Sequence, residues 1–548
     1  MSATPTSARS AGSGRTAGSA GSAGSGRTVG SGRTAGTAGA GGTSLNAARR
    51  ARELAAIAEY GQADLLVVGG GITGVGVALD AASRGLSVVL AERHDLAFGT
   101  SRWSSKLVHG GLRYLARGEV GIAYESAAER GLIMERLAPH LTRPLPMIYP
   151  WLPGTSRGSR ALTSTGLAAA DVLRLAARTS RRTLPRPRRL TRTEALAAVP
   201  QLRRDVTGGM LTWDGQLTDD ARLVVAVART AAAYGAVILT RCEASGLTAD
   251  GALLTDRLTG DSFRLRTKAV VNAAGVWAGQ LAEGVALRPS RGTHLVLADA
   301  ALGGLRAGLI APVPGERNRF VFAVPVPDEP RVYVGLTDEP ADGPLPEVPE
   351  PTTGEISFLL ETVSTVLDAP VGRGDVLGAF AGLRPLLCGP AAGDVDGATA
   401  DLSRRHAVLT SPDGVITVVG GKLTTYRRMA RDAVDAALDG RTAGACRTHR
   451  LPLVGAAAPQ ALARLRGPAR LVARYGTEAP AVLGLAGKDP WLAEPVAQGV
   501  PVTGAEFVFA VRHEGALDSG DLLDRRTRIG LVPADREQAL KAAVRALA

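Results

Sequence analysis

The first strong hydrophobic pattern of the chain lies in residues 65–68, which are all apolar and are followed by a run of glycines. Such a short run is typical of a parallel strand that is buried on both faces. A helical pattern over 46–60 precedes it, and a helix over 75–84 and a second strand over 86–91 follow. This order predicts the beginning of a βαβ unit.

Further elements are expected along the rest of the chain. Residues 269–271 and 415–419 have the pattern of buried strands, and the second leads into a helix over 426–438. Residues 320–322 and 334–337 predict two strands separated by a turn, before a proline-rich loop over 340–351. The C-terminal part, from Pro459 on, is mostly helical, so we expect a separate domain over 446–548.

Length and composition constrain the domain organisation. A chain of 548 residues is well above the roughly 250–300 residues at which a single core stops growing, so at least two domains are expected. Residues 1–47 are nearly all Gly, Ala, Ser, Thr and Arg, and we predict a disordered tail because they have almost nothing to bury. No run of eighteen apolar residues is free of charged or strongly polar residues, which argues against a membrane-spanning helix.

Charge and cysteine content argue against several classes of protein. The net charge is +13, and six of the arginines lie in residues 1–50, where there is no acid. The remaining basic excess suits an enzyme for anionic ligands or one that rests on an anionic membrane surface. Nucleic-acid binding is not expected, because only 4% of residues are aromatic. The three cysteines have no CxxC spacing, so we expect no metal site and a reducing, cytoplasmic compartment.

The glycine motif after the first strand predicts a dinucleotide site. Gly69, Gly71 and Gly74 form GxGxxG between a strand and a helix. The first glycine makes the tight turn, the second lets a pyrophosphate approach the backbone, and the third lets helix and strand pack closely. Glu92 ends the second strand, where its carboxylate would accept both ribose hydroxyls of an adenosine. A glycine turn also occurs for packing alone, and FAD and NAD remain alternatives at this point.

Two later segments favour FAD. Residues 269–277 form an apolar strand that runs into a turn of small residues, as expected where a strand closes over a flavin. Gly420 and Gly421 follow the strand 415–419 and open the helix 426–438. That helix start can point its N–H groups at the pyrimidine end of an isoalloxazine, where negative charge collects on reduction. The alternative is an ordinary strand-to-helix turn.

The segment 100–115 (TSRWSSKLVHGGLRYL) closely resembles the signature of the FAD-dependent glycerol-3-phosphate dehydrogenases, the quinone-linked, aerobic-type respiratory enzymes. Shorter matches follow in the family's order: 214–222 (DGQLTDDAR), 272–278 (NAAGVWA), 292–296 (GTHLV), 335–338 (GLTD), 382–386 (GLRPL), 420–428 (GGKLTTYRR) and 525–528 (RRTR). The resemblance implies an α/β fold: an FAD-binding Rossmann-like domain of the glutathione-reductase/D-amino-acid-oxidase type, interleaved over 60–445 with an antiparallel-sheet substrate domain, plus the C-terminal helical domain. One departure is Arg102-Trp103, where relatives often have small residues.

The resemblance also implies the reaction: oxidation of sn-glycerol 3-phosphate to dihydroxyacetone phosphate, with hydride passing from C2 to flavin N5 and electrons leaving to a membrane quinone. A phosphate dianion calls for planar, permanently charged guanidinium groups, which Arg113 and Arg384 would provide. The alternative for either arginine is a structural ion pair. His294 is predicted to be the base that takes the C2 hydroxyl proton, and His109 a residue of the flavin loop, although either could be a structural histidine.

Lys422, at the start of the flavin-facing helix, is predicted to stabilise the reduced ring or to touch the substrate, and the alternative is a solvated lysine. The catalytic set implied by the resemblance is therefore His294, Arg384 and Lys422, and the substrate-binding set is Arg113, Arg384 and Lys422. The implied cofactor-binding set is Gly69, Gly71, Gly74, Glu92, Thr100, Ser101, Ser105, His109, Ala274, Gly275, Gly421 and Lys422.

Several expectations concern partners. The basic stretch 178–192, with seven arginines in fifteen residues, is predicted to be an exposed loop that could touch anionic lipid headgroups, or simply a solvated face. We therefore expect a cytoplasmic protein, peripheral on the inner face of the plasma membrane, and a homodimer is a further expectation. Two other functions stay open on the sequence: a glycerol-3-phosphate oxidase that uses oxygen, and a non-catalytic flavoprotein.

Overall fold

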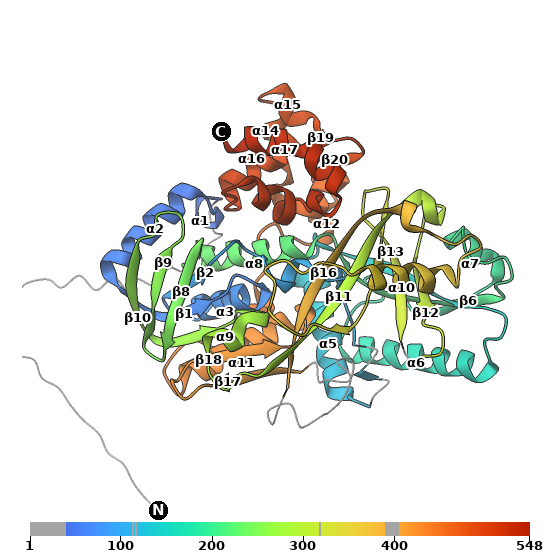
Figure 1. Ribbon diagram of the computed structural model, residues 1–548, viewed down its shortest axis with the longest axis horizontal. Helices are drawn as coiled ribbons and strands as arrows, with labels where there is room; N and C mark the ends of the chain where they lie inside the picture. The colour runs from blue at the N-terminus through green and yellow to red at the C-terminus, as the bar shows by residue number, and fades with distance from the viewer. Residues whose placement is uncertain (1–39, 112–113, 116–117, 317–318, 389–404) are drawn as a thin grey trace, which may run out of the picture. The chain divides into compact units, whose positions relative to one another are not determined.

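The computed structural model describes residues 40–111, 114–115, 118–316, 319–388 and 405–548 (Figure 1). Its first sheet has the strand order β17-β18-β10-β1-β2-β7, in which the five strands from β18 to β7 are parallel to one another and β17 is an antiparallel edge. The strands are β1 (Gln62–Val68), β2 (Val88–Glu92), β7 (Val237–Thr240), β10 (Ser262–Asn272), β17 (His406–Thr410) and β18 (Ile416–Gly420). The predicted βαβ unit is confirmed.

Both faces of this sheet are covered, which is why its strands are continuously apolar. Three helices, α3 (Ile72–Ser83), α8 (Asp220–Ala233) and α11 (Tyr426–Leu438), pack with the sheet in one buried cluster. On the other face the strands contact α2 (Ala47–Tyr60) and the hairpin of β8 (Cys242–Thr248) and β9 (Gly251–Asp256). The helix predicted over 426–438 is observed with those bounds.

The second sheet is mostly antiparallel and has the order β15-β11-β14-β13-β12-β4-β6-β3, with β16 paired to β11 and β5 to β6. Its strands are β3 (Leu107–Val108), β4 (Thr142–Trp151), β5 (Arg188–Leu190), β6 (Gly208–Leu217), β11 (Leu287–Ala298), β12 (Gly308–Pro312), β13 (Phe320–Pro325), β14 (Arg331–Gly335), β15 (Glu339–Pro340) and β16 (Val376–Leu387). Helices α7 (Arg192–Ala198) and α10 (Thr353–Ser364) pack against the apolar face of this sheet.

The chain leaves the first sheet twice and returns to it each time, so the domains are interleaved as expected. Strands β3 to β6 are inserted between β2 and β7 of the first sheet, together with α5 (Val120–Leu132) and α6 (Arg157–Ala176). Strands β11 to β16 are inserted between β10 and β18. Because the two insertions pair with each other, residues far apart in sequence meet on one sheet.

The C-terminal region is mostly helical and contains one hairpin. Its elements are α12 (Pro459–Leu462), α13 (Ala469–Tyr475), α14 (Ala479–Ala486), α15 (Pro490–Ala493), β19 (Pro495–Ala497), β20 (Val500–Thr503), α16 (Gly504–His513), η10 (Asp521–Arg526), η11 (Ile529–Leu531) and α17 (Pro533–Leu547). Two buried clusters of its own side chains form its core. No helix in the described ranges combines the length and apolar character that crossing a bilayer requires.

Two sequence predictions are wrong in part. The disordered tail was expected to reach residue 47, but α1 spans Ala40–Thr43 and Leu45 is only 5% exposed, because it is bridged to Glu514 of the C-terminal region. Residues 1–39 of that prediction lie outside the described residues. The stretch 178–192 is not a loop throughout, because β5 occupies Arg188–Leu190 and α7 starts at Arg192.

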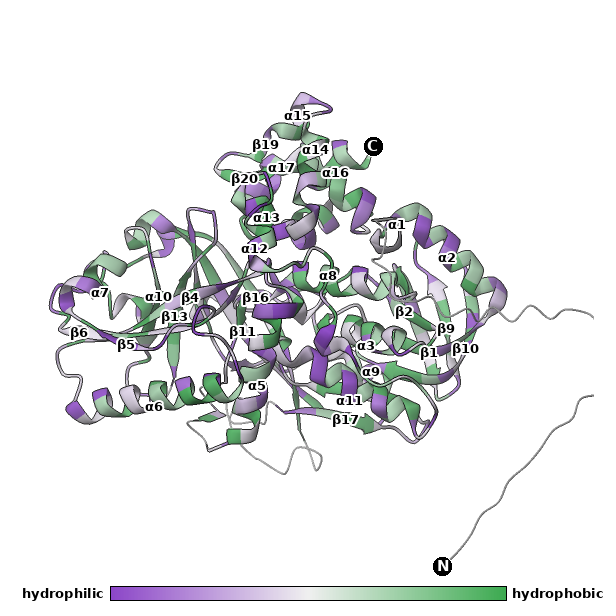
Figure 2. Ribbon diagram, turned by 180° about the vertical axis from the view of Figure 1, so that it is seen from behind, coloured by the Kyte–Doolittle hydropathy of each residue, from purple (hydrophilic) through white to green (hydrophobic). Residues whose placement is uncertain are grey.

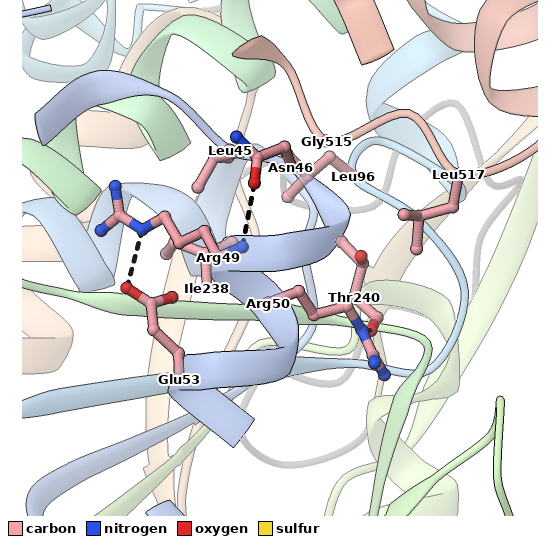
Figure 3. Close-up of a pocket in the computed structure, with 10 residues that line it drawn as sticks. All are labelled: Leu45, Asn46, Arg49, Arg50, Glu53, Leu96, Ile238, Thr240, Gly515 and Leu517. Atoms are coloured by element: carbon pink, nitrogen blue, oxygen red, sulfur yellow. Dashed lines mark hydrogen bonds and ion pairs between the residues drawn. The ribbon is translucent and has the colours of Figure 1, made fainter. Parts of the chain in front are cut away.

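A small pocket marks where the segment before β1 contacts the C-terminal region. It lies between α2, β7 and the loop around Gly515 (Figure 3), and Arg49 closes one side through an ion pair with Glu53, at 2.7 Å. Its volume of about 20 Å³ is enough for a single water molecule. None of the predicted site residues lines it, so this pocket is not the candidate site.

Candidate active site

The glycines of the first turn are required by close backbone contacts. Gly69 has φ +111°, and a Cβ atom at this position would lie 2.7 Å from the carbonyl oxygen of Ala273. A Cβ atom on Gly74 would lie 1.9 Å from the carbonyl oxygen of Gly69. The helix α3 begins at Ile72, three residues before the predicted start, and Gly71 has no side chain to cap it, so its first turn can offer backbone N–H groups to an anion.

Glu92 lies at the carboxyl end of β2 and faces this turn. Its Oε2 accepts a hydrogen bond from the Gly70 N–H at 2.6 Å, and its Oε1 accepts one from the His94 N–H at 2.7 Å. Burial raises the pKa of Glu92, although both of these hydrogen bonds oppose that effect. Each carboxylate oxygen keeps a second lone pair, which can accept a ribose hydroxyl.

The loop that follows connects the helix start to the second sheet. The Oγ of Ser101 accepts a hydrogen bond from the Ile72 N–H at 2.9 Å. The hydroxyl of Thr100 donates to the carbonyl oxygen of Leu383 on β16 at 2.6 Å, and Ser105 Oγ lies 2.9 Å from His294 Nε2. The predicted cofactor residues Thr100, Ser101 and Ser105 therefore lie on one segment, which we call the cofactor loop (residues 99–106).

His294 lies on β11 and is almost fully buried, with 1% of its surface exposed. Its imidazole stacks on Phe380, its cross-strand neighbour on β16, with ring centroids 4.8 Å apart. The ring occupies the space above Gly335, where a Cβ atom would lie 2.3 Å from its Cδ2. The packing thus holds the imidazole in one orientation, and no described residue bonds its Nδ1.

The surroundings of His294 favour the neutral imidazole. Burial lowers its pKa well below the usual value of 6.5, and the positive charges of Lys106 and Arg384 lower it further. A neutral imidazole can accept a proton at neutral pH, which is what the predicted base requires.

Arg384 lies on the same face of the second sheet. It is the cross-strand neighbour of Ser290, and its guanidinium lies over Gly292, where a Cβ atom would be 2.2 Å from Nη2. Residues 290, 292 and 294 of one strand share a face, so this guanidinium lies beside His294. It donates to Ser290 Oγ at 3.1 Å and to Asp338 Oδ1 at 3.2 Å. The structural ion pair that was the alternative for this arginine is therefore present. A role in substrate binding stays a prediction.

A second group of predicted residues surrounds the short helix after β18. Lys422 donates to Ser126 Oγ of α5 at 3.1 Å, and its ammonium lies 4.0 Å from the centre of the Tyr114 ring. The His109 N–H donates to Thr424 Oγ1 at 3.2 Å. Lys422 is thus packed against an aromatic ring and a hydroxyl. Gly421, with φ +70°, precedes it in the left-handed conformation that favours glycine.

The side chain of His109 lies toward solvent on one side and toward an acid on the other. Its Nδ1 is 3.5 Å from Asp214 Oδ2, and Arg130 donates to the other oxygen of the same carboxylate at 2.8 Å. Burial would raise the pKa of Asp214, but Arg130 and His109 outweigh that effect and lower it to about 2. His109 therefore has an acid partner as well as a backbone contact to Thr424 in the turn after β18.

The turn after β10 brings Ala274 and Gly275 close to the glycine motif. The Ala274 N–H donates to Asn272 Oδ1 at 3.2 Å, and Gly275 has φ +60°. Asn272 also donates from Nδ2 to the carbonyl oxygen of Ala278 at 2.9 Å, which closes the turn. The predicted substrate residue Arg113 lies outside the described residues.

Three residues with clear roles in this geometry were not predicted from the sequence: Tyr114, Lys106 and Asp220. Tyr114 contacts Lys422, and the only signal for it was its place beside Arg113 in the cofactor-loop signature. Lys106 and Asp220 form a buried ion pair at 2.9 Å behind the cofactor loop. Both lie in matched motifs, but no local pattern indicates that they pair, because 114 residues separate them.

These residues fit FAD. The N-terminus of α3 suits the pyrophosphate, Glu92 suits the ribose, and the cofactor loop runs from this helix to the sheet that holds His294. Gly421 and Lys422 begin the helix turn that was expected to face the pyrimidine end of the ring. The fold and this site together define the class of FAD-dependent oxidoreductases.

Comparison with known proteins agrees with that class. The chain matches a family described as FAD dependent oxidoreductase over residues 64–427, and a family described as the C-terminal domain of alpha-glycerophosphate oxidase over 446–548. It is 56% identical over 506 residues to glycerol-3-phosphate dehydrogenase 1 of Mycobacterium tuberculosis, covering 91% of this chain and 98% of that one. It is 34% identical over 553 residues to a mitochondrial glycerol-3-phosphate dehydrogenase of Arabidopsis thaliana, covering 89% and 83%.

Solved structures show the same fold. The glycerol-3-phosphate dehydrogenase from Bacillus halodurans complexed with FAD is similar over 92% of this chain and 94% of that one, with a TM-score of 0.69 and 28% identity. The L-alpha-glycerophosphate oxidase from Mycoplasma pneumoniae with FAD bound shares the fold over 71% of this chain and 98% of that one, with a TM-score of 0.53 and 18% identity. The chain belongs to the family of FAD-dependent glycerol-3-phosphate dehydrogenases, and its cofactor is FAD.

Proposed function

We propose that this protein oxidises sn-glycerol 3-phosphate to dihydroxyacetone phosphate and passes the electrons to a membrane quinone. The observation that carries the proposal is the placement of a neutral, buried His294 between the cofactor loop and Arg384. In this arrangement the cofactor loop binds FAD, the imidazole of His294 accepts a proton, and the guanidinium of Arg384 binds the phosphate of the substrate. The identity to dehydrogenases of this name supports the same substrate.

The chemistry of the residues follows from their surroundings. Bound FAD supplies the hydride acceptor for C2 of the substrate. His294 takes the proton of the C2 hydroxyl, so that the carbonyl forms as the hydride leaves. Arg384 binds the phosphate through a planar, permanently charged group, and Lys422 adds a second cation where it can reach the substrate or the reduced ring. Trp103, which fills the space above Gly382 on the same sheet face, helps to exclude water.

The substrate is tested by an anaerobic titration of the flavin. Purified protein is mixed with sn-glycerol 3-phosphate, and we expect the flavin absorbance near about 450 nm to be bleached, because the flavin accepts the hydride. Glycerol without the phosphate is the control and should leave the flavin oxidised. An oxidised flavin in the presence of the phosphate ester would contradict the proposed substrate.

The electron acceptor is tested on the same reduced protein. We expect a quinone analogue to restore the oxidised flavin faster than oxygen does, when the two acceptors are compared at equal concentration. Faster return with oxygen would favour the second candidate function, a glycerol-3-phosphate oxidase. This second candidate is retained because the L-alpha-glycerophosphate oxidase from Mycoplasma pneumoniae shares the fold.

Replacement of Arg384 tests the phosphate contact. We expect Arg384→Ala to raise KM for sn-glycerol 3-phosphate by at least roughly tenfold, since a charge-assisted hydrogen bond contributes about 1.5–3 kcal/mol. The matched control is Arg291→Ala, because Arg291 lies on the neighbouring strand and pairs with Glu355 at 2.9 Å. Steady-state kinetics distinguish the two, and an unchanged KM in Arg384→Ala would contradict the substrate role and favour the structural ion pair with Asp338.

We also propose that the protein rests on an anionic membrane surface through α6. Only three of the twenty residues of this helix are buried. Its exposed positions recur at helical spacing and carry no charge along one stripe: Leu162, Thr165, Ala168, Val172 and Leu175. Figure 2 shows apolar turns along this outer helix. An apolar stripe facing solvent is typical of a helix that lies in a membrane interface.

The basic stretch 178–192, which follows α6, provides positive charge that would attract an anionic membrane surface. All seven arginines of the stretch 178–192 are exposed, and among the described residues no carboxylate pairs with Arg178, Arg181, Arg182 or Arg189. Each basic side chain near an anionic surface contributes about 1 kcal/mol. This supports a cytoplasmic protein that is peripheral on the inner face of the plasma membrane, where a quinone is accessible. The homodimer stays a prediction that light scattering tests.

Vesicle binding tests the α6 surface. We expect the protein to sediment with vesicles that contain phosphatidylglycerol, and the triple variant Leu162→Ser, Val172→Ser and Leu175→Ser to bind at least roughly tenfold more weakly, because three apolar side chains no longer insert. The matched control is the double variant Leu540→Ser and Val544→Ser on α17, which are also exposed. Equal binding of the triple variant and the unaltered protein would contradict this surface.

A further inference from the structure

The arginines of the RRTR segment, residues 525–528, have no place in the reaction described above, yet they are deeply buried. The exposed fractions of Arg525, Arg526 and Arg528 are 5%, 1% and 7%. They lie at the end of η10 in the C-terminal region and contact loops of the FAD-binding part of the chain. Guanidinium groups are buried at a large desolvation cost, so their partners are informative.

Two of these arginines hold the loop that follows Glu92. Arg526 donates to both oxygens of Asp95, at 2.7 and 2.8 Å, and Arg525 donates to the same carboxylate at 2.6 Å. Burial would raise the pKa of Asp95, but these two arginines outweigh that effect and lower it strongly. The carboxylate is therefore charged and completely buried, and it accepts three hydrogen bonds from the two arginines.

The Asp95 loop in turn supports the glycine motif. Ala97, two residues after Asp95, donates its N–H to the carbonyl oxygen of Gly70 at 3.0 Å. Gly70 is the residue whose N–H binds Glu92. Arg525 and Arg526 of the C-terminal region thus bind the loop that contacts Gly70. Gly70 belongs to the motif that is expected to bind the adenosine and the pyrophosphate.

The third arginine holds the cofactor loop. Arg528 donates from Nη2 to the carbonyl oxygen of Arg102, and its Nε lies 3.8 Å from Asp220 Oδ1. Asp220 accepts from both the N–H and the hydroxyl of Ser104, at 2.9 and 2.8 Å, and from Lys106. Ser105, between these two residues of the loop, bonds His294.

We propose that Arg525, Arg526 and Arg528 are positioning residues for FAD, through which the C-terminal region holds the Asp95 loop and the cofactor loop in the geometry that binds the flavin. The inference rests on the FAD site and does not depend on the electron acceptor. Loss of one partner leaves a buried charge without its counterion, so the loop that carries it must move. FAD affinity therefore depends on contacts that the C-terminal region makes with these two loops.

A different ion pair between the same regions provides the matched control. Arg331, on β14, pairs with Asp535, on α17, and both are buried, at 8% and 7% exposed. This pair also joins the C-terminal region to the rest of the chain, but it touches neither loop. Asp95→Asn and Asp535→Asn therefore make the same chemical change in two buried carboxylates that bind arginine, and only Asp95 lies on a loop that supports the glycine motif.

The experiment measures the dissociation constant of FAD from folded apoprotein, by quenching of flavin fluorescence, with far-UV circular dichroism to monitor folding. We expect Asp95→Asn to bind FAD at least roughly tenfold more weakly, because it loses charge-assisted contacts, and Asp535→Asn to stay within about twofold of the unaltered protein. The absorption band of the bound flavin should shift in Asp95→Asn and not in Asp535→Asn.

Two further variants make the outcome decisive. Arg528→Lys keeps the charge but not the geometry, and we expect FAD affinity between those of Arg528→Ala and the unaltered protein. If Asp95→Asn fails to fold, the ranking of the two Arg528 variants decides the question. The proposal is overturned if these folded variants bind FAD as the unaltered protein does, or if Asp535→Asn weakens FAD binding to the same degree as Asp95→Asn.

Discussion

His294→Asn is expected to lower the rate of flavin reduction by sn-glycerol 3-phosphate about 10²- to 10⁴-fold, which is the usual contribution of a general base. Asparagine keeps a polar group near Ser105 but cannot take the proton, so FAD should remain bound. Anaerobic stopped-flow absorbance measures the rate directly. The matched control is His449→Asn, because His449 lies in the segment after α11, where its ring accepts a hydrogen bond from Arg450, and should not affect the rate. An unchanged rate in His294→Asn would assign the proton transfer to another group.

The pH dependence follows from the same residue. A base must be deprotonated to act, so kcat/KM falls as the pH drops through its pKa in the free enzyme. The pKa of His294 lies well below 6.5, because of its burial and the charges of Lys106 and Arg384. We therefore expect kcat/KM to be insensitive to His294 protonation above pH 6.5, with the acid limb at lower pH and absent in His294→Asn.

Gly74→Ala is expected to abolish FAD binding. The added Cβ atom would lie 1.9 Å from the carbonyl oxygen of Gly69, which is backbone and cannot rotate away. Overpacking typically costs about 1–3 kcal/mol even where side chains can adjust, so here a loss of affinity of more than roughly 100-fold is expected. The ratio of flavin to protein absorbance after purification, with circular dichroism to confirm folding, gives the result.

Gly121→Ala is the matched control for this prediction. Gly121 lies within α5, and a Cβ atom there would have no neighbour within 4 Å, apart from the helix's own backbone and adjacent residues. Alanine should be accepted and should favour the helix slightly. Full flavin content in Gly74→Ala would mean that the turn can open without losing the pyrophosphate site, which would contradict the role assigned to this glycine.

Much of the fold could be predicted because it depends on local patterns. The apolar run that becomes β1, the existence of a helix after the glycine motif and the helix α11 were all recognised from residues within about ten positions of one another. The end of the disordered tail was misjudged for the opposite reason. Leu45 is ordered by a bridge to Glu514, which no local pattern indicates.

The candidate site was only partly predictable, since motifs identify residues but not their partners. Arg384 was selected as a permanently charged group for a phosphate, but Asp338 already provides it with a carboxylate partner. The seven arginines of the stretch 178–192 were correctly expected to be exposed, yet the uncharged stripe of α6 next to them was recognised only when the helix was seen to lie outside the core.

The sequence by itself determined the cofactor class and the family. Gly69, Gly71, Gly74 and Glu92 indicate a dinucleotide through local backbone geometry, and the signature around the cofactor loop narrows it to FAD. Only the tertiary structure decided how these parts are held together. Ser105 meets His294 across 189 residues, and Arg528 meets Arg102 across 426, because the interleaved sheets and the C-terminal region bring distant segments together. Such contacts depend on packing over the whole chain, which leaves no local periodicity to recognise.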